Sequence, residues 1–452
     1  MNYKETLTFL YENLPMFQRT GQAAYKANLD NTHRMDEALG HPHRRFKSVH
    51  VAGTNGKGSV SHMLASAFME SGYKTALYTS PHLLDFRERI RINGEMIPPA
   101  EVTRFVNRHM DLILEIAPSF FEITAMMAFD YFAREEPDIA IIETGMGGRL
   151  DSTNIIQPEL AVITNISHDH ARFLGPTTRH IAGEKAGIIK SRVPVVLGSM
   201  DPGVIPVFTE RASALHAPLY RADQARELLL ATQTPEELMN VRFRLSSTGE
   251  TEMWQTDLMG SYQQENLQTV LAALDVMRPM GWKLPADRVG AGLTGVIPRT
   301  GLHGRWETLA HHPRVICDTG HNSGGIQSVV RQLEQVPAQT LHMVFGSVND
   351  KEPEEILSLL PAHARYYFVR SSVPRSADPA VLKEKGAGYG LRGETFERVE
   401  EGVRAARREA GPNDVIFIGG STFVVADALP LMREKRGGPT GNVGPANTNR
   451  DQ

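Results

Sequence analysis

The chain has 452 residues, which is long enough for two domains with separate hydrophobic cores. Its formal net charge of −4, with both signs well mixed, gives no sign of a surface for nucleic acid or for acidic membranes. The single cysteine, Cys317, excludes an internal disulfide and a thiolate-built metal site, and no run approaches the roughly 20 apolar residues of a membrane span. We therefore expect a cytoplasmic protein.

Short apolar strands alternate with helices in the first half of the chain. The spacing of Val60, Leu64, Phe68 and Met69 predicts a helix over residues 57–71. Buried strands are expected at residues 49–52, 74–78, 138–144, 160–166 and 193–198. Because these β-branched runs are continuous, they favour a mainly parallel sheet with helices on both faces.

A similar alternation resumes near residue 314. Strands are expected at residues 314–320, 341–346, 365–369 and 414–420, with helices over 323–336 and from 421 onward. The Gly- and Pro-rich stretch at 295–307 separates the halves and favours a boundary near Pro298. We predict an α/β protein with an N-terminal domain over 1–297, a smaller Rossmann-like domain over 298–434 and a disordered tail over 435–452.

The stretch "VAGTNGKGS" at residues 51–59 joins a strand to a helix and is similar to a phosphate-binding loop. Fewer residues separate its first glycine from the Gly-Lys pair than in the common pattern. Backbone N–H groups can hold a phosphate chain there, while a lysine neutralises charge and a serine hydroxyl meets Mg²⁺. We interpret the loop as an ATP site made of Gly53, Thr54, Asn55, Gly56, Lys57, Gly58 and Ser59; the alternative is an ordinary glycine-rich turn.

Two further strands end in groups that can bind a cation. Glu143 lies at the carboxyl end of its strand, where open α/β sheets bind ligands, although it could also cap the next turn. His168, Asp169 and His170 follow the strand at 160–166. Two histidines around one acid could suggest Zn²⁺, but without a cysteine and beside a phosphate loop Mg²⁺ or Mn²⁺ is favoured, and a surface turn is the alternative.

Three other stretches have simpler interpretations from the residues alone. Lys185, within "IAGEKAGIIK", is expected to pair with Glu184 or to lie exposed on a helix. The stretch "HPHRRFK" at 41–47 is interpreted as a solvated basic turn. An apolar stripe is expected to be mostly core, although one ring could face a ring-shaped substrate; it contains Phe120, Phe121, Met126, Met127 and Phe129.

Together these stretches resemble the folylpolyglutamate synthase/dihydrofolate synthase family within the Mur ligase superfamily. The resemblance runs from about residue 25 to residue 429. It rests on "HVAGTNGKGS", "YTSPHL", "RERIRINGE", "FFEITAMMAF", "ETGMGGRLDSTN", the "DH" at 169–170, "EKAGI", "GRWE" and "DTGHN". The compressed loop, with Gly58 after the lysine, looks like the form used by these ATP-dependent amide ligases and differs from that of kinases and GTPases.

The resemblance implies roles for residues in the first domain. Residues matching the phosphate loop and two Mg²⁺ sites are Lys57, Ser59, Ser80, Glu143, His170 and Lys185, and the family's lysine is carbamylated, which replaces an ammonium with an oxygen ligand. Residues matching the pteroate side are Pro81, His82, Phe121 and Asp151. Gln263 and Asn266, in "SYQQENL", match the segment that meets the nucleotide base.

In the second domain, Arg305, Asp318 and His321 match residues that face the interdomain cleft, and Ser421 matches a glutamate contact. The implied reaction is attack of a pteroate or folate carboxylate on the γ-phosphate of ATP, followed by attack of the L-glutamate amine on the acyl phosphate. His321 is a candidate for the base. The implied protein is a monomer that binds small molecules, and the choice between dihydrofolate synthesis, polyglutamate extension or both stays open.

Two alternatives come from other classes. A P-loop ATPase switch would explain Gly53–Ser59 but not the second α/β domain. A Mur-type ligase acting on a UDP-sugar would share the domain plan, but "TSPHL" and "FFEITAMMAF" argue against it.

Overall fold

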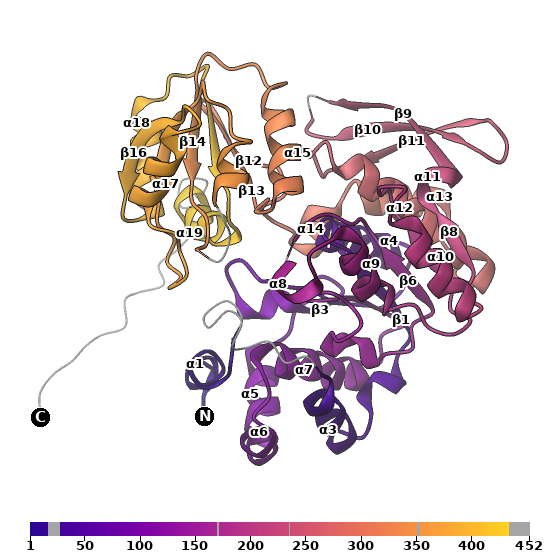
Figure 1. The fold of residues 1–452 in the computed structure, drawn as a ribbon. Coiled ribbons are helices and arrows are strands. Elements are labelled where there is room, and N and C mark those ends of the chain that lie inside the picture. Colours follow the sequence, from indigo (N-terminus) through magenta and orange to yellow (C-terminus); the bar gives the residue numbers. More distant parts are fainter. Residues whose placement is uncertain (17–27, 170, 235, 350–352, 434–452) are drawn as a thin grey trace, which may run out of the picture.

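The structure is a computed structural model that describes residues 1–16, 28–169, 171–234, 236–349 and 353–433. The predictions for His170 and for the tail at 435–452 therefore lie outside the described residues. Figure 1 shows two α/β units side by side, the first in indigo to pink and the second in orange to yellow. The predicted α/β class, with a mainly parallel first sheet and a smaller second domain, is confirmed.

The first domain is built on an eight-stranded sheet in the order β4-β3-β2-β5-β1-β6-β7-β8. Six of these strands are parallel to one another, and β3 and β4 form an antiparallel edge. Their bounds are β1 Ser48–Ala52, β2 Thr75–Tyr78, β3 Ile90–Ile92, β4 Glu95–Met96, β5 Ile139–Glu143, β6 Leu160–Ile163, β7 Val195–Leu197 and β8 Leu219–Arg221.

Helices cover both faces of this sheet because successive strand residues point to opposite sides. Val49 and Val51 of β1 join the core beneath α4 (Lys57–Glu70), α12 (Gln263–Met277), α13 (Ala286–Leu293) and α14 (Val296–Thr300). The other face packs against α5 (Pro99–Arg108), α7 (Phe120–Glu135), α9 (Thr178–Ala186) and α10 (Ile205–Ala214). Shorter or peripheral helices are α1 (Tyr3–Asn13), α3 (Asp30–Ala38), η2 (Pro42–Arg45), η3 (Phe86–Arg89), α6 (Met110–Ile116), η4 (Ser152–Ile155), α8 (Ala171–Leu174), α11 (Ala222–Ala225) and η5 (Arg278–Met280).

A three-stranded antiparallel sheet in the first domain was not predicted. It consists of β9 (Arg226–Gln233), β10 (Met239–Leu245) and β11 (Thr251–Thr256). On β10, Val241 and Phe243 are buried, whereas Arg242 and Arg244 between and after them are exposed. This alternation, visible in "NVRFRL", is the sequence signal for a half-buried antiparallel strand.

The second domain has a six-stranded sheet in the order β12-β13-β17-β14-β15-β16, and only β12 is antiparallel to its neighbour. Its strands are β12 Glu307–His311, β13 Arg314–Asp318, β14 Leu341–Phe345, β15 Arg365–Val369, β16 Arg392–Phe396 and β17 Val415–Gly419. Its helices are α15 Ser323–Leu333, α16 Pro353–Leu357, α17 Pro379–Ala387, α18 Val399–Glu409 and α19 Thr422–Arg433. Pro298, near which we predict the domain boundary, lies within α14, which packs against α4.

The turn at 41–47 differs from its interpretation as a solvated basic turn. His43 contributes a side chain that is only 10% exposed, and it contacts the buried Asp36 of α3. The basic residues Arg44 and Arg45 are exposed as expected. Among the described helices, none combines the length and the apolar character that a membrane crossing requires.

Candidate active site between the two domains

Two glycines of the loop between β1 and α4 are required by the close approach of neighbouring side chains. A Cβ on Gly53 would lie 1.8 Å from Thr164 Oγ1, and one on Gly56 would lie 2.2 Å from Asn266 Oδ1. Both residues also have positive φ, of 152° and 83°. A side chain at either position would therefore displace the loop from the end of β6 or from α12.

The loop is held by hydrogen bonds to the residues that follow β6. The Asn165 carbonyl accepts from the Thr54 N–H at 2.9 Å, and the Asn165 side chain accepts from the Asn55 N–H at 2.9 Å. The Thr164 hydroxyl donates to the Asn55 carbonyl at 2.6 Å. Because these contacts come from the residues directly after the neighbouring strand β6, the protein itself fixes the conformation of the loop. Helix α4 begins directly after the loop, with its N-terminus at the proposed phosphate site.

Two lysines donate to one carbonyl oxygen in this loop. Lys57 Nζ lies 3.1 Å from the Gly53 oxygen and 3.1 Å from the Thr54 oxygen, and Lys185 Nζ lies 2.8 Å from the Gly53 oxygen. Burial, and then the positive charge of Lys57, lowers the pKa of Lys185 to about 7. The site thus holds two nearby lysine amines, of which that of Lys185 loses its proton more easily.

The simple interpretation of Lys185 as exposed or paired with Glu184 is wrong. Its side chain lies on the inner face of α9 and the residue is 3% exposed. Glu184 instead contacts Arg149, with 2.8 Å between Oε1 and Nη2. Glycines on both sides allow α9 to pack closely on the loop at 145–149: a Cβ on Gly148 of the loop would lie 2.9 Å from the Glu184 carbonyl oxygen, and one on Gly187, after α9, would lie 2.4 Å from Arg149 Cα.

Glu143 ends β5 directly beside the phosphate loop. Its carboxylate accepts a 3.1 Å hydrogen bond from the Ser80 N–H, and both carboxylate oxygens lie 3.9 Å from the position of a Cβ on Gly58. Burial raises the pKa of Glu143, and the charges of Lys57 and Arg305 oppose that rise. Ser59 is buried nearby and its hydroxyl accepts from Gln263 Nε2 at 3.1 Å.

Asp151 holds the loop that follows β5. One carboxylate oxygen accepts from the N–H groups of Gly145 and Met146 at 2.8 and 2.9 Å. The other accepts from the Thr153 N–H at 3.0 Å and from the Thr153 hydroxyl at 2.5 Å. A carboxylate has about four lone-pair positions, so this pattern uses its full accepting capacity within the protein.

A cavity of about 310 Å³ lies between the domains. Several predicted residues line it, namely Gly53, Thr54, Lys57, Ser80, Pro81, Phe121, Asp151 and Lys185 from the first domain and His321 and Ser421 from the second. Asp169, which the sequence grouped with His168 and His170 as a candidate cation-binding group, also lines it, as do Arg89 and Arg375, which the sequence did not single out. Arg89 is buried, and its guanidinium lies 5.2 Å from the ring centre of Phe120. Its signal was the charged "RERI", in which Arg89 ends the short helix η3 directly before β3.

Four predicted residues near this site are not among those that line the cavity. His82 does not line the cavity. Its Nδ1 accepts from Arg89 Nε at 2.7 Å, so His82 orients Arg89, which does line the cavity. Gln263 and Asn266, expected near a nucleotide base, contact the phosphate loop at Ser59 and Gly56. Glu143 instead lines a smaller adjacent cavity of about 40 Å³, which it shares with Ser80, Gly58 and Arg305.

Asp318 accepts hydrogen bonds from both sides of the connection between the two domains. It accepts from the Trp306 N–H at 2.8 Å, from the Gly320 N–H at 2.7 Å and from the hydroxyl of Tyr262, at the start of α12, at 2.5 Å. Burial raises the pKa of Asp318, and these donors oppose that rise. Next to it, Arg305 contacts the Thr319 hydroxyl and reaches toward Gly58.

The start of α15 meets the phosphate loop. The amides of Asn55 and Asn322 exchange two hydrogen bonds, and Asn322 Nδ2 also donates to Asp169 Oδ2 at 2.9 Å. His321 Nε2 lies 3.7 Å from the same Asp169 oxygen. The second domain therefore contacts the loop through polar groups that border the cavity.

Comparison with known proteins agrees with this geometry. The description "Mur ligase middle domain" matches residues 51–274, and "Mur ligase, glutamate ligase domain" matches residues 304–422. The fold and the site thus define an ATP-dependent ligase of the Mur ligase superfamily.

The relatives are more specific. The "Dihydrofolate synthase/folylpolyglutamate synthase" of Bacillus subtilis (strain 168) is 31% identical over 427 residues, covering 90% of this chain and 95% of that protein. A "Probable bifunctional folylpolyglutamate synthase/dihydropteroate synthase" of Haloferax volcanii is 30% identical over 436 residues, and the chain spans 50% of its length. The solved structure "E.coli FolC in complex with DHPP and ADP" matches with a TM-score of 0.84 at 27% identity, covering 97% of this chain and 99% of that one. The chain belongs to the folylpolyglutamate synthase/dihydrofolate synthase family.

Proposed function

We propose that this chain adds L-glutamate to dihydropteroate, to folates or to both, at the expense of ATP. The observation that carries the proposal is that the phosphate loop, with Lys57 and Lys185, opens into a cavity lined by both domains. A related structure contains DHPP and ADP, which supports a nucleotide and a second small molecule at the corresponding place.

The chemistry follows from the poor electrophilicity of a carboxylate. The loop N–H groups and Lys57 would hold the phosphates of ATP, so that the substrate carboxylate attacks the γ-phosphorus and ADP leaves. The glutamate amine then attacks the acyl carbon, loses a proton and releases phosphate. An acyl phosphate is readily hydrolysed, so a cavity closed by two domains protects the intermediate from water.

The two sides of the cavity suit different parts of the substrates. Phe121 offers an apolar ring face, and Arg89 offers a buried positive charge, to a flat heterocycle with polar edges. On the opposite side Arg375, His321 and Ser421 offer donors to the carboxylates of glutamate. His321 remains our candidate for the base, since its ring lies beside the Asp169 carboxylate.

The loop region also fits Mg²⁺. Glu143 is a buried carboxylate whose pKa is raised by desolvation, and the hydroxyls of Ser59 and Ser80 belong to the same region. Oxygen donors of this kind are those that Mg²⁺ prefers, and they would hold it against the phosphates. When bound, Mg²⁺ supplies neutralisation of the charge that develops on the phosphoryl group.

Lys185 is proposed to be carbamylated. Its amine is buried, and its pKa of about 7 leaves much of it neutral at physiological pH. The neutral nitrogen can bond to the carbon of CO₂ with loss of one proton, which gives a carbamate anion. This change would convert repulsion between Lys185 and Lys57 into attraction and provide an oxygen ligand for a second Mg²⁺.

The decisive experiment measures ADP release with a panel of acceptors: dihydropteroate, tetrahydrofolate and a UDP-sugar peptide precursor, each with and without L-glutamate. We expect release only when a pteroate or folate and glutamate are both present. Release without any acceptor would indicate an ATPase switch, and release with the UDP-sugar would indicate a peptidoglycan-type ligase. Lys57→Ala should remove the activity in every arm.

A further inference from the structure

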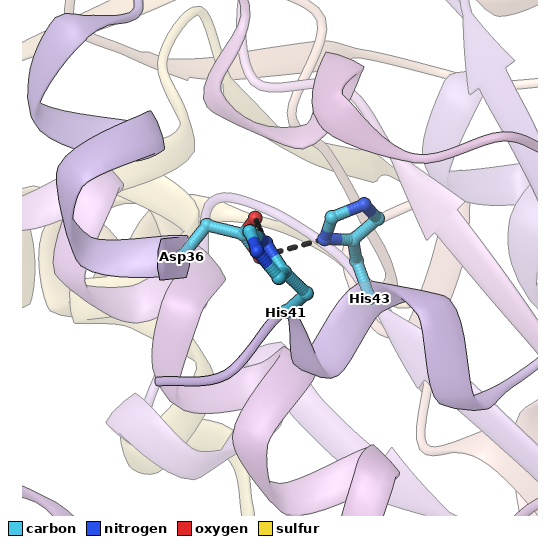
Figure 2. A group of neighbouring side chains, drawn as sticks. All are labelled: Asp36, His41 and His43. Atoms are coloured by element: carbon cyan, nitrogen blue, oxygen red, sulfur yellow. Dashed lines mark hydrogen bonds and ion pairs between the residues drawn. The ribbon is translucent and has the colours of Figure 1, made fainter. Parts of the chain in front are cut away.

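A cluster of three potential metal ligands lies outside the catalytic site. Asp36, in the last turn of α3, places its carboxylate between two imidazole rings (Figure 2). Its Oδ2 lies 2.7 Å from His41 Nδ1, and its Oδ1 lies 2.6 Å from His43 Nδ1. Each of the three side chains offers one ligand atom, and these atoms lie within 4.8 Å of one another. Among the described residues, no other group of three or more histidine, cysteine or acidic side chains has this arrangement.

The backbone brings these side chains together. Gly40 and His41 have left-handed φ values of 72° and 55°, which turn the chain back after α3. The His41 N–H then donates to the Asp36 carbonyl at 2.8 Å, and Pro42 begins η2, which carries His43. A left-handed conformation at a non-glycine residue is uncommon, and it is what points the His41 ring at the carboxylate.

The three side chains differ in exposure in a way that suits ion entry. The side chains of Asp36 and His43 are 5% and 10% exposed, whereas that of His41 is 40% exposed. Within the described part of the chain, Asp36 forms ion pairs only with these two imidazoles, so no lysine or arginine lies against its buried carboxylate. A buried carboxylate in this position gains from a cation that the two rings can share.

We propose that Asp36, His41 and His43 bind a divalent transition-metal ion of the zinc class. Two imidazole nitrogens and one carboxylate are the donor set that Zn²⁺, Co²⁺ and Ni²⁺ accept, whereas Mg²⁺ favours oxygen donors alone. Each ring binds through Nδ1 in its neutral form, with the proton on Nε2, and the exposed His41 side leaves room for water as a further ligand. Zinc–ligand bonds of about 2.0–2.2 Å require these nitrogens and oxygens to separate slightly, and the turn that carries His41 can supply that movement.

This site is distinct from the phosphate loop. The turn at 41–47 leads into the first residue of β1, and the loop follows its last residue, so the strand separates the two by roughly 13 Å. A metal ion here would fasten α3 to the turn before β1. Asn28, two residues before α3 begins, lines the substrate cavity, so the ion would stabilise a wall of that cavity without touching the reaction.

The test is equilibrium dialysis of the full-length protein against Zn²⁺, followed by measurement of bound zinc per chain. The wild type should bind one more equivalent than His41→Gln/His43→Gln, and any zinc taken up by the catalytic site cancels in this difference. His33→Gln, an exposed histidine on the same helix, should match the wild type. His43→Gln alone should weaken binding at least about tenfold, since even groups behind the ligands contribute that much.

A second measurement does not depend on activity or stoichiometry. Zn²⁺ should raise the thermal unfolding temperature of the wild type more than that of the double variant, because a ligand stabilises the state that binds it. Glutamate-dependent ADP release should be unchanged in both proteins. Equal zinc content and equal thermal shifts in folded wild type and double variant would overturn the proposal. Asp36, His41 and His43 would then only hold α3 to the following turn through their hydrogen bonds. If the double variant fails to fold, the single His41→Gln variant, altered at the exposed ligand, decides in the same way.

Discussion

Asn55 and Asn322 pair their side-chain amides across the two domains, with Nδ2–Oδ1 distances of 3.2 and 2.9 Å. Asn55 belongs to the phosphate loop, and Asn322 caps α15 by accepting from the Gly325 N–H at 2.8 Å. One residue therefore fixes the start of a helix in the second domain and contacts the loop proposed to hold ATP. This pairing predicts that the nucleotide site and the position of the second domain are coupled.

The first prediction tests this coupling with Asn322→Ser. Serine preserves the helix cap but cannot form the amide pair or the hydrogen bond to Asp169, so α15 should stay folded while its contacts with the first domain are lost. Loss of the two hydrogen bonds of the amide pair, worth about 1 kcal/mol each, should lower kcat/KM for ATP roughly 30-fold. Combined with Asn55→Ala, the variant forms a double-mutant cycle in which the two losses should not add. Additive losses would show that the pair does not couple the domains.

The second prediction concerns the phosphate and metal groups. Lys57→Ala and Glu143→Gln should remain folded. Within the described residues Lys57 donates only to carbonyls of its own loop, and glutamine can still accept from the Ser80 N–H. Glutamate-dependent ADP formation should fall by on the order of 10²-fold or more in each, because charge stabilisation at the phosphate is lost. Circular dichroism checks that the variants are folded, and steady-state kinetics measures the loss of ADP formation. Near-normal turnover would contradict the assignment.

The third prediction separates two roles of Asp151. In Asp151→Asn the amide NH₂ replaces one oxygen and faces two donors, so the free energy of unfolding should fall by about 1–3 kcal/mol. If Asp151 also helps to select dihydropteroate, dihydrofolate synthesis should fall more than polyglutamate extension. Asp378→Asn, at the N-cap of α17, is the control for the same substitution where the amide oxygen can still accept the capping hydrogen bond. Equal losses of both activities would leave Asp151 with its structural role alone.

The fourth prediction concerns Lys185. Lys185→Ala should be nearly inactive, and a short carboxylate such as acetate should partly restore activity by replacing the missing oxygen ligand. The wild type should lose activity in CO₂-depleted buffer and regain it when bicarbonate is added. Lys185→Arg, which keeps a positive charge but does not form a stable carbamate, should not respond to bicarbonate. Full activity without CO₂ would mean that the bare amine is the working form.

The fifth prediction is a dependence of stability on pH that originates at His50 of β1. Burial lowers the pKa of His50 to about 3, and its Nε2 donates to the Thr153 hydroxyl at 2.9 Å. In the unfolded chain His50 binds a proton near pH 6.5, whereas in the folded protein it stays neutral until about pH 3. The contribution of His50 to the free energy of unfolding is therefore complete above pH 6.5 and is lost as the pH falls toward 3. The loss should amount to roughly 2–3 kcal/mol at pH 4.5. Urea unfolding of His50→Gln should show a smaller slope, because burial also lowers the pKa values of His62 and His82, whereas the exposed His33→Gln should keep the full slope.

The amino-acid sequence by itself determined the α/β class and the phosphate loop. Continuous apolar runs identify buried parallel strands, and glycines at fixed offsets with a lysine identify a loop, because both signals are local. The sequence missed the β9–β11 sheet, whose strands alternate buried and exposed residues and depend on α12 and α13 for one apolar face. It also placed strand ends a few residues too late, as at β6, where Thr164 and Asn165 turn to hold the loop.

Only the tertiary structure decided how distant residues share their charges. Lys185 looked like a surface lysine because helical spacing does not show that α9 packs against Gly53 of another element. Asp151 looked available to a substrate until its carboxylate was found to accept four hydrogen bonds from its own loop. His43 looked solvated until α3 placed Asp36 beside it. Desolvation and ion pairing act through space, so they become visible only when the chain has folded.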